Sequence, residues 1–300
     1  MSTNRVICER DMKMTITVHT NLPSVKVQKN LNNATNALNK SLERLSTGLK
    51  INRAADDAAG LYVASNLTTQ ISGSKIAQAN VESGTNILNT TEGNLDIILD
   101  NLNRIRDLAL QASSGVYGNE SRTALSSEVK ARATEITRIS QATEFNGIKL
   151  LDGSVNKDLR LQVGANADAV ANSISVSQTV FANVSANSTA IALGDSTAIE
   201  TAFATATAAA QYITTVDNAI KNINERKSVI GAMQNRLESA AASLLTTIEN
   251  ASAAKSTIMD TDVSAETAEY TKAQILQQTS ATLLLQANQL PAIALQLLAG

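Results

Sequence analysis

The residues that could perform chemistry are few and are not grouped into a site. The chain of 300 residues contains one histidine, His19, and one cysteine, Cys8. A Ser-His-Asp or Cys-His catalytic site needs a supporting group that the sequence around these two residues does not supply. A zinc site of the H-E-x-x-H type needs two histidines, and a single cysteine excludes an internal disulfide. The sequence therefore predicts a protein that is not an enzyme and that holds no metal or cofactor.

A run of acidic residues gives the nearest approach to a metal site. Residues 260–266 read Asp-Thr-Asp-Val-Ser-Ala-Glu, which resembles the start of a calcium loop. However, Ala265 stands where such a loop needs glycine, and Thr271 stands where it needs a bidentate glutamate. Asp262 and Ser264 are also common helix-capping residues. We therefore interpret this run as the start of a helix.

Composition excludes several classes of partner. The net charge of -2 and the pI near 5.6 argue against a surface for nucleic acid or anionic membranes. No run approaches the 18 apolar residues of a transmembrane helix. The first 30 residues lack the apolar core of a cleavable signal peptide. We therefore expect no nucleic-acid or membrane partner, and any export of this protein would follow another route.

Long heptad patterns dominate the chain and must position everything else. One runs from Ile213 to Ile258 and predicts a helix of roughly 70 Å. A second runs from Ser74 to Ala112 and predicts a helix of roughly 58 Å. Because the two patterns share their period, we expect the helices to lie side by side. The expected fold is mainly α, an elongated rod of long coiled-coil helices in which the N- and C-terminal helices are paired.

Both ends of the chain carry a further apolar helix pattern. Little else remains in the sequence to cover these faces except each other, and a single two-helix contact is marginal in water, so we predict that they mediate polymerisation. A membrane-lying helix is the rival interpretation, but residues 275–300 lack the basic residues such helices carry. The predicted polymerisation residues are Leu31, Leu38, Leu42, Leu45, Leu49, Ile275, Leu276, Leu283, Leu284 and Leu290.

Shorter elements are predicted between the long patterns. A loop over 50–60 should precede a short helix that ends near Ile71, with the long helix starting after Gly73. A third helix is expected over 121–141. Alternating apolar residues over 159–163 and 174–176 indicate a β-hairpin. A capping box at Thr197 and Glu200 predicts that the last long helix starts near Ala198.

Several motifs resemble bacterial flagellin and appear in its order at both ends of the chain. They cover roughly residues 14–166 and 212–298, which is most of the sequence. The motifs are Ser41–Asn52, Ala55–Gly60, Thr91–Gly93, Phe145–Gly147, Leu161–Asn166 and Gln286–Pro291.

The resemblance implies a structural subunit that polymerises into the filament used for swimming. It also implies release to the cell exterior through the flagellar export apparatus, without a cleavable signal. The chain would be a short form that lacks large outer domains. The implied organisation is a non-family and disordered extension (1–13), terminal helices of the inner filament core (14–58 and 256–300), a rod bundle with a β-hairpin (59–178 and 211–255) and a short variable connection rich in Ala, Ser and Thr (179–210).

Partners also follow from the resemblance. They are further copies of the chain, an export chaperone at the C-terminal segment, the filament cap and the hook-junction proteins. Arg104, Leu108 and Glu128 match a patch that flagellins of this type present to a vertebrate innate immune receptor and to neighbouring subunits. A hook-filament junction protein and a flagellin-like surface adhesin remain as alternative functions.

Overall fold

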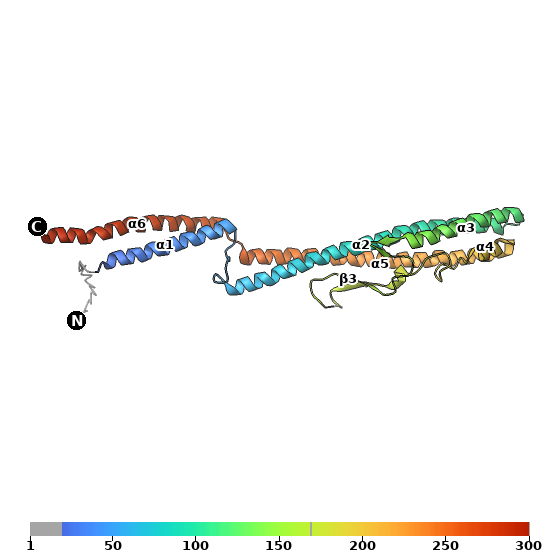
Figure 1. The fold of residues 1–300 in the computed structure, drawn as a ribbon, viewed down its shortest axis with the longest axis horizontal. Helices are drawn as coiled ribbons and strands as arrows, with labels where there is room; N and C mark the ends of the chain where they lie inside the picture. The colour runs from blue at the N-terminus through green and yellow to red at the C-terminus, as the bar shows by residue number, and fades with distance from the viewer. Residues whose placement is uncertain (1–19, 169, 300) are drawn as a thin grey trace, which may run out of the picture. The chain divides into compact units, whose positions relative to one another are not determined.

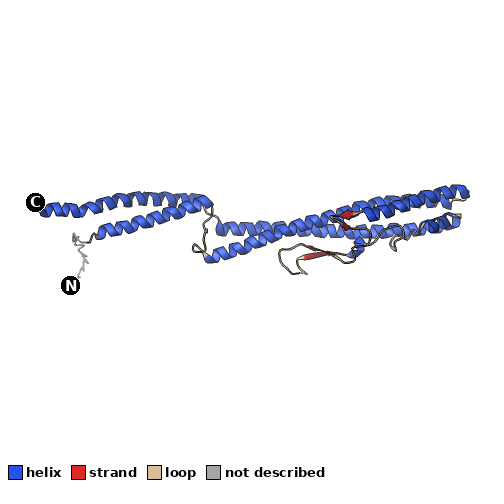
Figure 2. Ribbon diagram, in the orientation of Figure 1, coloured by secondary structure: helices blue, strands red, loops and turns tan. Residues whose placement is uncertain are grey.

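The structure is a computed structural model, which describes the backbone of residues 20–168 and 170–299 and the side chains as far as Gln289. The predicted extension over residues 1–13 lies outside the described residues. Helices make up most of the described chain (Figure 1, Figure 2), which confirms the mainly α prediction. The elements are α1 (Leu22–Thr47), α2 (Ala58–Ser113), α3 (Asn119–Ala142), β1 (Glu144–Phe145), β2 (Ile148–Lys149), β3 (Leu159–Gln162), β4 (Ser173–Val176), η1 (Gln178–Phe181), α4 (Ser196–Phe203), α5 (Ala206–Met259) and α6 (Val263–Ala299).

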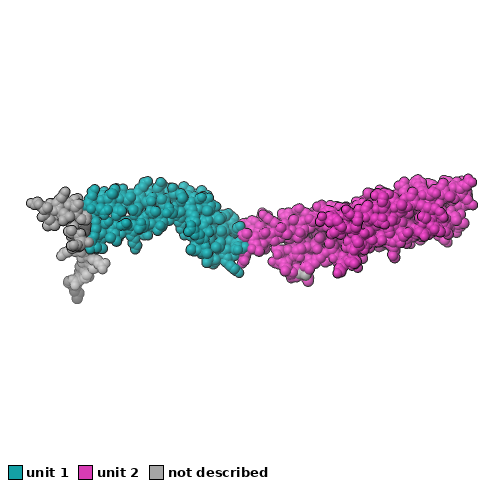
Figure 3. Space-filling view, in the orientation of Figure 1, with its two compact units in different colours: residues 1–65, 254–300 teal, residues 66–253 magenta. Residues whose placement is uncertain are grey.

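The chain forms two compact units, shown in different colours in Figure 3. One consists of residues 1–65 and 254–300, and the other consists of residues 66–253. We call them the terminal unit and the central unit.

In the terminal unit, α1 and α6 lie side by side and run in opposite directions (Figure 1). Near the start of α1, the side-chain amide of Asn21 donates to the backbone carbonyl of Ala287 at 2.8 Å. Near its end, Arg44 forms an ion pair with Glu266 at 3.4 Å. These contacts confirm the predicted pairing of the N- and C-terminal helices.

A heptad pattern of burial fixes how α1 and α6 meet. On each helix the residues that are not fully exposed recur at alternating spacings of three and four, which is the spacing of a two-helix seam. The buried members are small, apart from Glu266. They are Ala34 and Ser41 on α1, and Ala273, Ser280 and Ala287 on α6. Small residues let two helix backbones approach closely, but they bury little apolar area.

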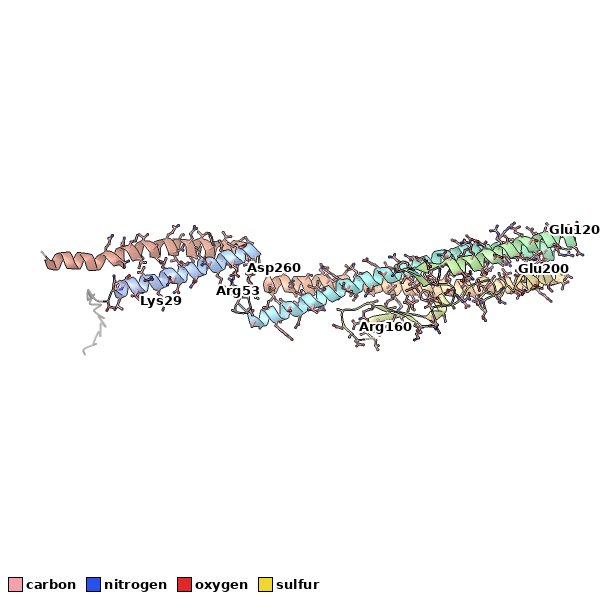
Figure 4. The ribbon with its side chains drawn as sticks, viewed as in Figure 1. Lys29, Arg53, Glu120, Arg160, Glu200 and Asp260 are labelled. Atoms are coloured by element: carbon pink, nitrogen blue, oxygen red, sulfur yellow. The ribbon has the colours of Figure 1, made fainter. Side chains whose placement is uncertain are left out.

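Short backbone contacts close the terminal unit where α1 ends and α6 begins. Gly48 ends α1 in the left-handed region at φ 73°, where glycine carries no steric penalty. The backbone N–H of Lys50 then donates to the carbonyl of Met259 at 2.7 Å, and that of Thr261 donates to Gly48 at 2.9 Å. Figure 4 labels Arg53 and Asp260 in the two connections that these bonds tie together.

The predicted break in α2 near Gly73 is wrong. α2 is one continuous helix of 56 residues, about 84 Å long at 1.5 Å per residue. Glycine in a helix interior costs about 1 kcal/mol relative to alanine. At Gly73 the missing side chain has a use, because a Cβ there would come within 2.9 Å of the Cβ of Ala165 in the loop after β3.

The core of the central unit is built by large apolar residues of α2, α3 and α5. The helix predicted over 121–141 is confirmed as α3, and α2 and α5 pack together as their heptads predict. Fully buried members include Leu88, Leu95, Ile98, Leu102 and Ile105 on α2, Val129 and Ile136 on α3, and Val216, Ile223, Ile230 and Leu237 on α5.

Three polar contacts join α2 to α5 alongside this core. Arg106 pairs with Asp217 at 2.6 Å, Lys227 pairs with Asp96, and the Gln234 amide donates to Asn89 at 2.9 Å. They explain why Lys227 and Gln234 stand at two of the heptad positions of α5, most of which are apolar. We call the three contacts the polar ladder.

The predicted β-hairpin is confirmed as β3 and β4, which pair antiparallel with Leu161 opposite Ile174. The hairpin lies against α2, where a Cβ on Gly84 would come within 2.4 Å of Leu161. The backbone carbonyl of Gln162 accepts a hydrogen bond from the Asn80 amide of α2 at 3.2 Å. A methyl group at position 84 would therefore force the Leu161 side chain to move.

The prediction that the last long helix starts near Ala198 is wrong. Ser196–Phe203 is a separate helix, α4, whose cap is Asp195 and not the predicted capping box. α5 begins only at Ala206, where the Thr205 hydroxyl accepts a hydrogen bond from the N–H of Ala208 at 3.1 Å. Each helix thus has its own N-cap, and two caps in close succession divide what composition alone presents as one helical stretch.

Candidate self-assembly surface

The structure separates the predicted polymerisation residues into two groups. Leu31, Leu38 and Leu45 on α1, with Leu284 on α6, lie in the α1–α6 seam and are partly buried there. They are spaced by seven residues on α1, in step with the buried Ala34 and Ser41. These leucines therefore hold the helix pair together within one copy of the chain.

A second group stands outside the seam with much of its apolar surface in solvent. Leu42 is 55% exposed, Ile275 57%, Leu276 49% and Leu283 46%. Leu285, which was not predicted, is exposed as well. Large apolar side chains left open on one helix pair are typical of a surface that another protein covers.

Two of the exposed leucines border a groove between the helices. Leu276 and Leu283 are seven residues apart and so share one side of α6. Together with Asn30, Asn33 and Ala37 of α1 they line a groove with a volume of about 500 Å³. The wall from α1 is low because its side chains are short. We call this groove, with its two leucines, the self-assembly groove.

The remaining two predicted residues fall elsewhere. Leu49 packs, partly buried, against the small apolar cluster of Ile51, Ala64 and Met259 in the terminal unit. The side chain of Leu290 lies outside the described residues. Leu49 therefore supports the connection after α1, and is not part of the exposed surface.

Two ion pairs on α1 hold the connection that follows it. Lys40 pairs with Asp56 at 2.8 Å, and Arg53 pairs with Glu43 at 3.0 Å. The bound Lys40 ammonium and the N–H groups of Asn52 and Arg53 hold the pKa of the Asp56 carboxyl below its usual value, against a smaller opposing effect of desolvation. Asp56 therefore stays ionised and keeps the loop folded onto α1.

Among the described residues, the one ion pair inside the seam joins Arg44 and Glu266. The Glu266 side chain is 11% exposed, and the Nε of Arg44 is buried without a hydrogen-bond partner in the described structure. A charge pair at one end of a seam of small residues specifies which residues face each other more than it adds stability. We take it to fix the register of α1 against α6.

The acidic run that resembles a calcium loop serves as the start of α6. The Asp262 carboxylate accepts from the N–H groups of Ser264 at 2.8 Å and Ala265 at 3.2 Å, and Glu266 is engaged by Arg44. The helix-start interpretation is confirmed. Among the described residues, no cluster of His, Cys, Asp and Glu could hold a metal ion, and no helix is long and apolar enough to cross a membrane.

Of the predicted patch of Arg104, Leu108 and Glu128, only the two charged residues lie at the surface. Arg104 of α2 donates from its Nε to Glu128 of α3 at 2.9 Å, and both side chains are partly exposed. Leu108 is 1% exposed and belongs to the core. Its heptad phase places it beside Ile105 and Ala112, so it does not lie on the surface of the isolated chain, in contrast to our expectation.

Sequence reasoning missed the small residues of the seam. Ala273, Ser280 and Ala287 repeat every seven residues, but our search for apolar heptads followed the leucines beside them. A search for small residues at heptad spacing would have found the seam.

The short β1–β2 hairpin was also not predicted. Its turn is Asn146-Gly147, a strong hairpin signal, and both residues have positive φ.

Comparison with known proteins shows which family the chain resembles. The family model described as the bacterial flagellin N-terminal helical region matches residues 18–156, and the bacterial flagellin C-terminal helical region matches residues 213–298. The flagellin of Halalkalibacterium halodurans is 39% identical, over 94% of this chain and 99% of the relative. The flagellin of Bacillus subtilis is 35% identical over the same shares. The flagellar filament 30.7 kDa core protein of Treponema maltophilum is 34% identical, over 90% of this chain and 95% of the relative.

Proposed function

The chain belongs to the bacterial flagellin family, and from this premise we propose that its terminal unit joins one copy to the next through the self-assembly groove. The chain is a structural subunit of the flagellar filament outside the cell and is not an enzyme. The alternatives, a hook-filament junction protein and a surface adhesin, are not favoured, because flagellins and filament proteins match nine-tenths or more of the chain.

One observation carries the proposal. The buried residues of the seam between α1 and α6 are small, apart from Glu266, while Leu276 and Leu283 remain about half exposed beside it. Fully burying a leucine contributes about 1.5–3 kcal/mol. A filament repeats the same contact in every copy, so two leucines per copy give a substantial driving force for assembly.

The test replaces both leucines by aspartate, as Leu276→Asp with Leu283→Asp. A buried carboxylate without a partner costs several kcal/mol in addition to the lost apolar contact. We expect the purified variant to remain monomeric under conditions in which the unaltered protein forms filaments, as judged by sedimentation and electron microscopy. Filaments of normal length would refute the proposal.

A matched control separates position from charge. Gln274→Asp with Gln278→Asp adds the same two charges to exposed positions of α6 that face away from the groove. This control should assemble normally. Circular dichroism of both variants should match that of the unaltered monomer, because neither change touches the seam.

The organisation of the filament follows from the same proposal. We place the terminal helices, residues 14–58 and 256–300, in the inner core of the filament. The bundle and hairpin of residues 59–178 and 211–255 form its outer wall, and residues 179–210 take the place of larger outer domains. This placement is supported by the self-assembly groove, which is formed by the terminal helices. Helices in the inner core of a filament are surrounded by other copies, and those copies can cover such an apolar surface.

Partners outside the filament are a second part of the proposal. From Ala273 to Gly300 the chain carries no Asp, Glu, Lys or Arg, and its described part exposes Ile275, Leu276, Leu283 and Leu285. Such a segment would aggregate before export, so we assign to it an export chaperone. Export without a cleavable signal, the filament cap and the hook-junction proteins complete the expected set of partners.

The surface around Arg104 and Glu128 is proposed as a contact between subunits and with the vertebrate innate immune receptor. The pair is solvent-accessible, and Arg132 extends it by donating to Asn101 at 3.3 Å. Leu108 would act from the core, by supporting the α2 face that presents Arg104. A receptor-activation assay with Arg104→Ala and Leu108→Ala distinguishes direct contact from this support, since only Leu108→Ala should also lower the thermal stability of the monomer.

A further inference from the structure

A cleft in the central unit is not used by the proposed assembly. It lies between residues 179–190 and α5, and its volume is about 680 Å³, a size that suits a small molecule. Six of its lining residues carry a short amide or hydroxyl side chain. They are Thr179, Asn183, Asn187, Ser188, Thr189 and Asn222.

Arg226 of α5 supplies a partly buried positive charge in this cleft. One guanidinium nitrogen donates to the backbone carbonyl of Ala182 at 2.7 Å. A guanidinium has five N–H donors, and no carboxylate among the described residues forms an ion pair with this one. Burial disfavours the charged form and lowers the pKa of Arg226 from its usual value. Arg226 therefore retains donors and an uncompensated charge.

The charge of the cleft selects a ligand with a single negative charge. The one acidic residue that lines the cleft, Glu225, is exposed and forms an ion pair with Lys221 of the same helix at 3.9 Å. Arg226 thus remains as one unpaired cation, which balances the single charge of a carboxylate more closely than the charge of about −1.5 to −2 of a phosphate monoester. A planar guanidinium matches the two oxygens of a carboxylate.

The walls of the cleft select hydroxyl groups. The Asn222 amide donates to the carbonyl of Ala190 at 2.8 Å, which leaves its own oxygen free to accept. Asn187 and Thr189 are exposed, and their side chains bond to nothing in the described part of the chain. An amide offers both a donor and an acceptor, as neighbouring hydroxyls require. The residues that line this cleft include no aromatic side chain, so nothing in it favours a ring that stacks.

We propose that this cleft binds a hydroxylated carboxylic acid of the sugar-acid class. The carboxylate binds to the free donors of Arg226, and the hydroxyl groups bond to Asn187, Thr189 and Asn222. The filament subunit would thereby carry a binding site for acidic sugars on the segment that replaces larger outer domains.

The test is a ligand titration of the full-length monomer, followed by NMR. Sodium D-glucuronate is the probe, D-glucose lacks its carboxylate, and sodium acetate lacks its hydroxyls. We expect saturable binding of glucuronate, and binding weaker by about tenfold or more for glucose and acetate, because each lacks one of the two groups recognised. Equal binding of acetate and glucuronate would remove the sugar from the proposal, and a failure of glucuronate to bind would overturn it.

Variants locate the binding within the cleft. Arg226→Gln should weaken glucuronate binding by about tenfold or more, while its amide can still donate to Ala182. Asn187→Ala alters an exposed side chain and should weaken the binding of glucuronate but not of acetate. Arg236→Gln, on the same helix but outside this cleft, is the matched control and should bind as the unaltered protein does. If Arg226→Gln bound glucuronate with unchanged affinity, the assignment of this cleft would be wrong.

Discussion

The terminal unit and the central unit are both built on antiparallel helix pairs, yet they fill their seams with side chains of very different size. The twelve largest fully buried side chains of the described residues all belong to the central unit. In the seam of the terminal unit the buried residues are instead Ala and Ser, apart from Glu266, and the leucines are only partly buried. Heptad spacing alone therefore does not make a helix pair self-sufficient, because the apolar area buried per turn decides its stability.

The difference assigns a separate task to each unit. In the central unit the large residues face inward and stabilise a single chain. In the terminal unit several large residues, such as Leu276 and Leu283, face solvent and are available to other copies. We therefore expect the stability of the central unit to be independent of protein concentration, and the stability of the terminal unit to rise on assembly.

The largest difference between the two units should appear when one leucine in each is replaced by alanine. Leu102→Ala removes a fully buried side chain of the central unit and should lower its free energy of unfolding by about 2–5 kcal/mol. Leu283→Ala should change the unfolding of the monomer by less than about 1 kcal/mol, yet raise the protein concentration needed for filaments. Urea unfolding of monomers and a sedimentation assay measure the two quantities. If both substitutions affected monomer stability equally, the distinction between the units would fail.

The second effect concerns the size of residues in the terminal seam. Ala273→Leu forces a large side chain between α1 and α6, where overpacking costs about 1–3 kcal/mol. We expect faster amide hydrogen exchange throughout α1 in the monomer. Ala281→Leu, at an exposed position of the same helix, is the control and should leave this exchange unchanged. An Ala273→Leu variant with better-protected amides would show that the seam prefers larger residues.

The third effect compares two glycines within α2. Gly93→Ala places a methyl group where nothing lies within 4 Å, so it should stabilise the central unit by about 0.5–1 kcal/mol. Gly84→Ala places the same group against the end of the Leu161 side chain, which must shift away from its packed position, and this should reduce or cancel that gain. Thermal unfolding of the two variants provides the measurement. Equal stabilisation by both would mean that the hairpin is not docked at Gly84.

The smallest effect is a titration in the terminal unit. The Asp56 carboxyl should titrate below its usual pKa of 3.8, since its hydrogen bond with Lys40 stabilises the ionised form. A depressed pKa adds stability that is present above the unfolded pKa and is lost as the pH falls through the folded pKa. Lys40→Met should raise the pKa of Asp56 toward 3.8, as followed by carboxyl carbon NMR shifts. Lys29→Met, at an exposed position of α1, should leave it unchanged.

The sequence predicts the long helices well because their signal is repeated many times. In the run from Ile213 to Ile258, eleven apolar positions in one register outweigh a single contrary residue such as Lys227. A local break is decided instead by a few residues whose meaning depends on contacts that are distant in the sequence. The sequence predicts a helix break at Gly73, but in the structure the absence of a side chain there makes room for Ala165, which lies far along the chain.

The segment of residues 179–210 was the hardest to interpret. Its composition of Ala, Ser, Thr and Asn resembles a loose connection, yet it buries Val180, Phe181, Ile191 and Phe203 in the core of the central unit. A few large apolar residues without a regular spacing give no helix or strand pattern. Only the folded chain shows which part of the core they fill. The self-assembly surface was predicted in part for a related reason, since leucine spacing identified the correct helices but not the face of each leucine.

The polar ladder between α2 and α5 fixes the register of these two helices in the central unit. Ten residues separate Arg106 from Asp96, and ten separate Asp217 from Lys227, so one alignment satisfies both ion pairs. A slip of the helices by one heptad would keep apolar residues in the seam and change its packing little. It would, however, place Arg106 opposite Ala210 or Asn224, and leave its charge without a partner. Leucine repeats are nearly periodic and tolerate such slips, so a few charges at unrepeated positions confine two very long helices to one alignment.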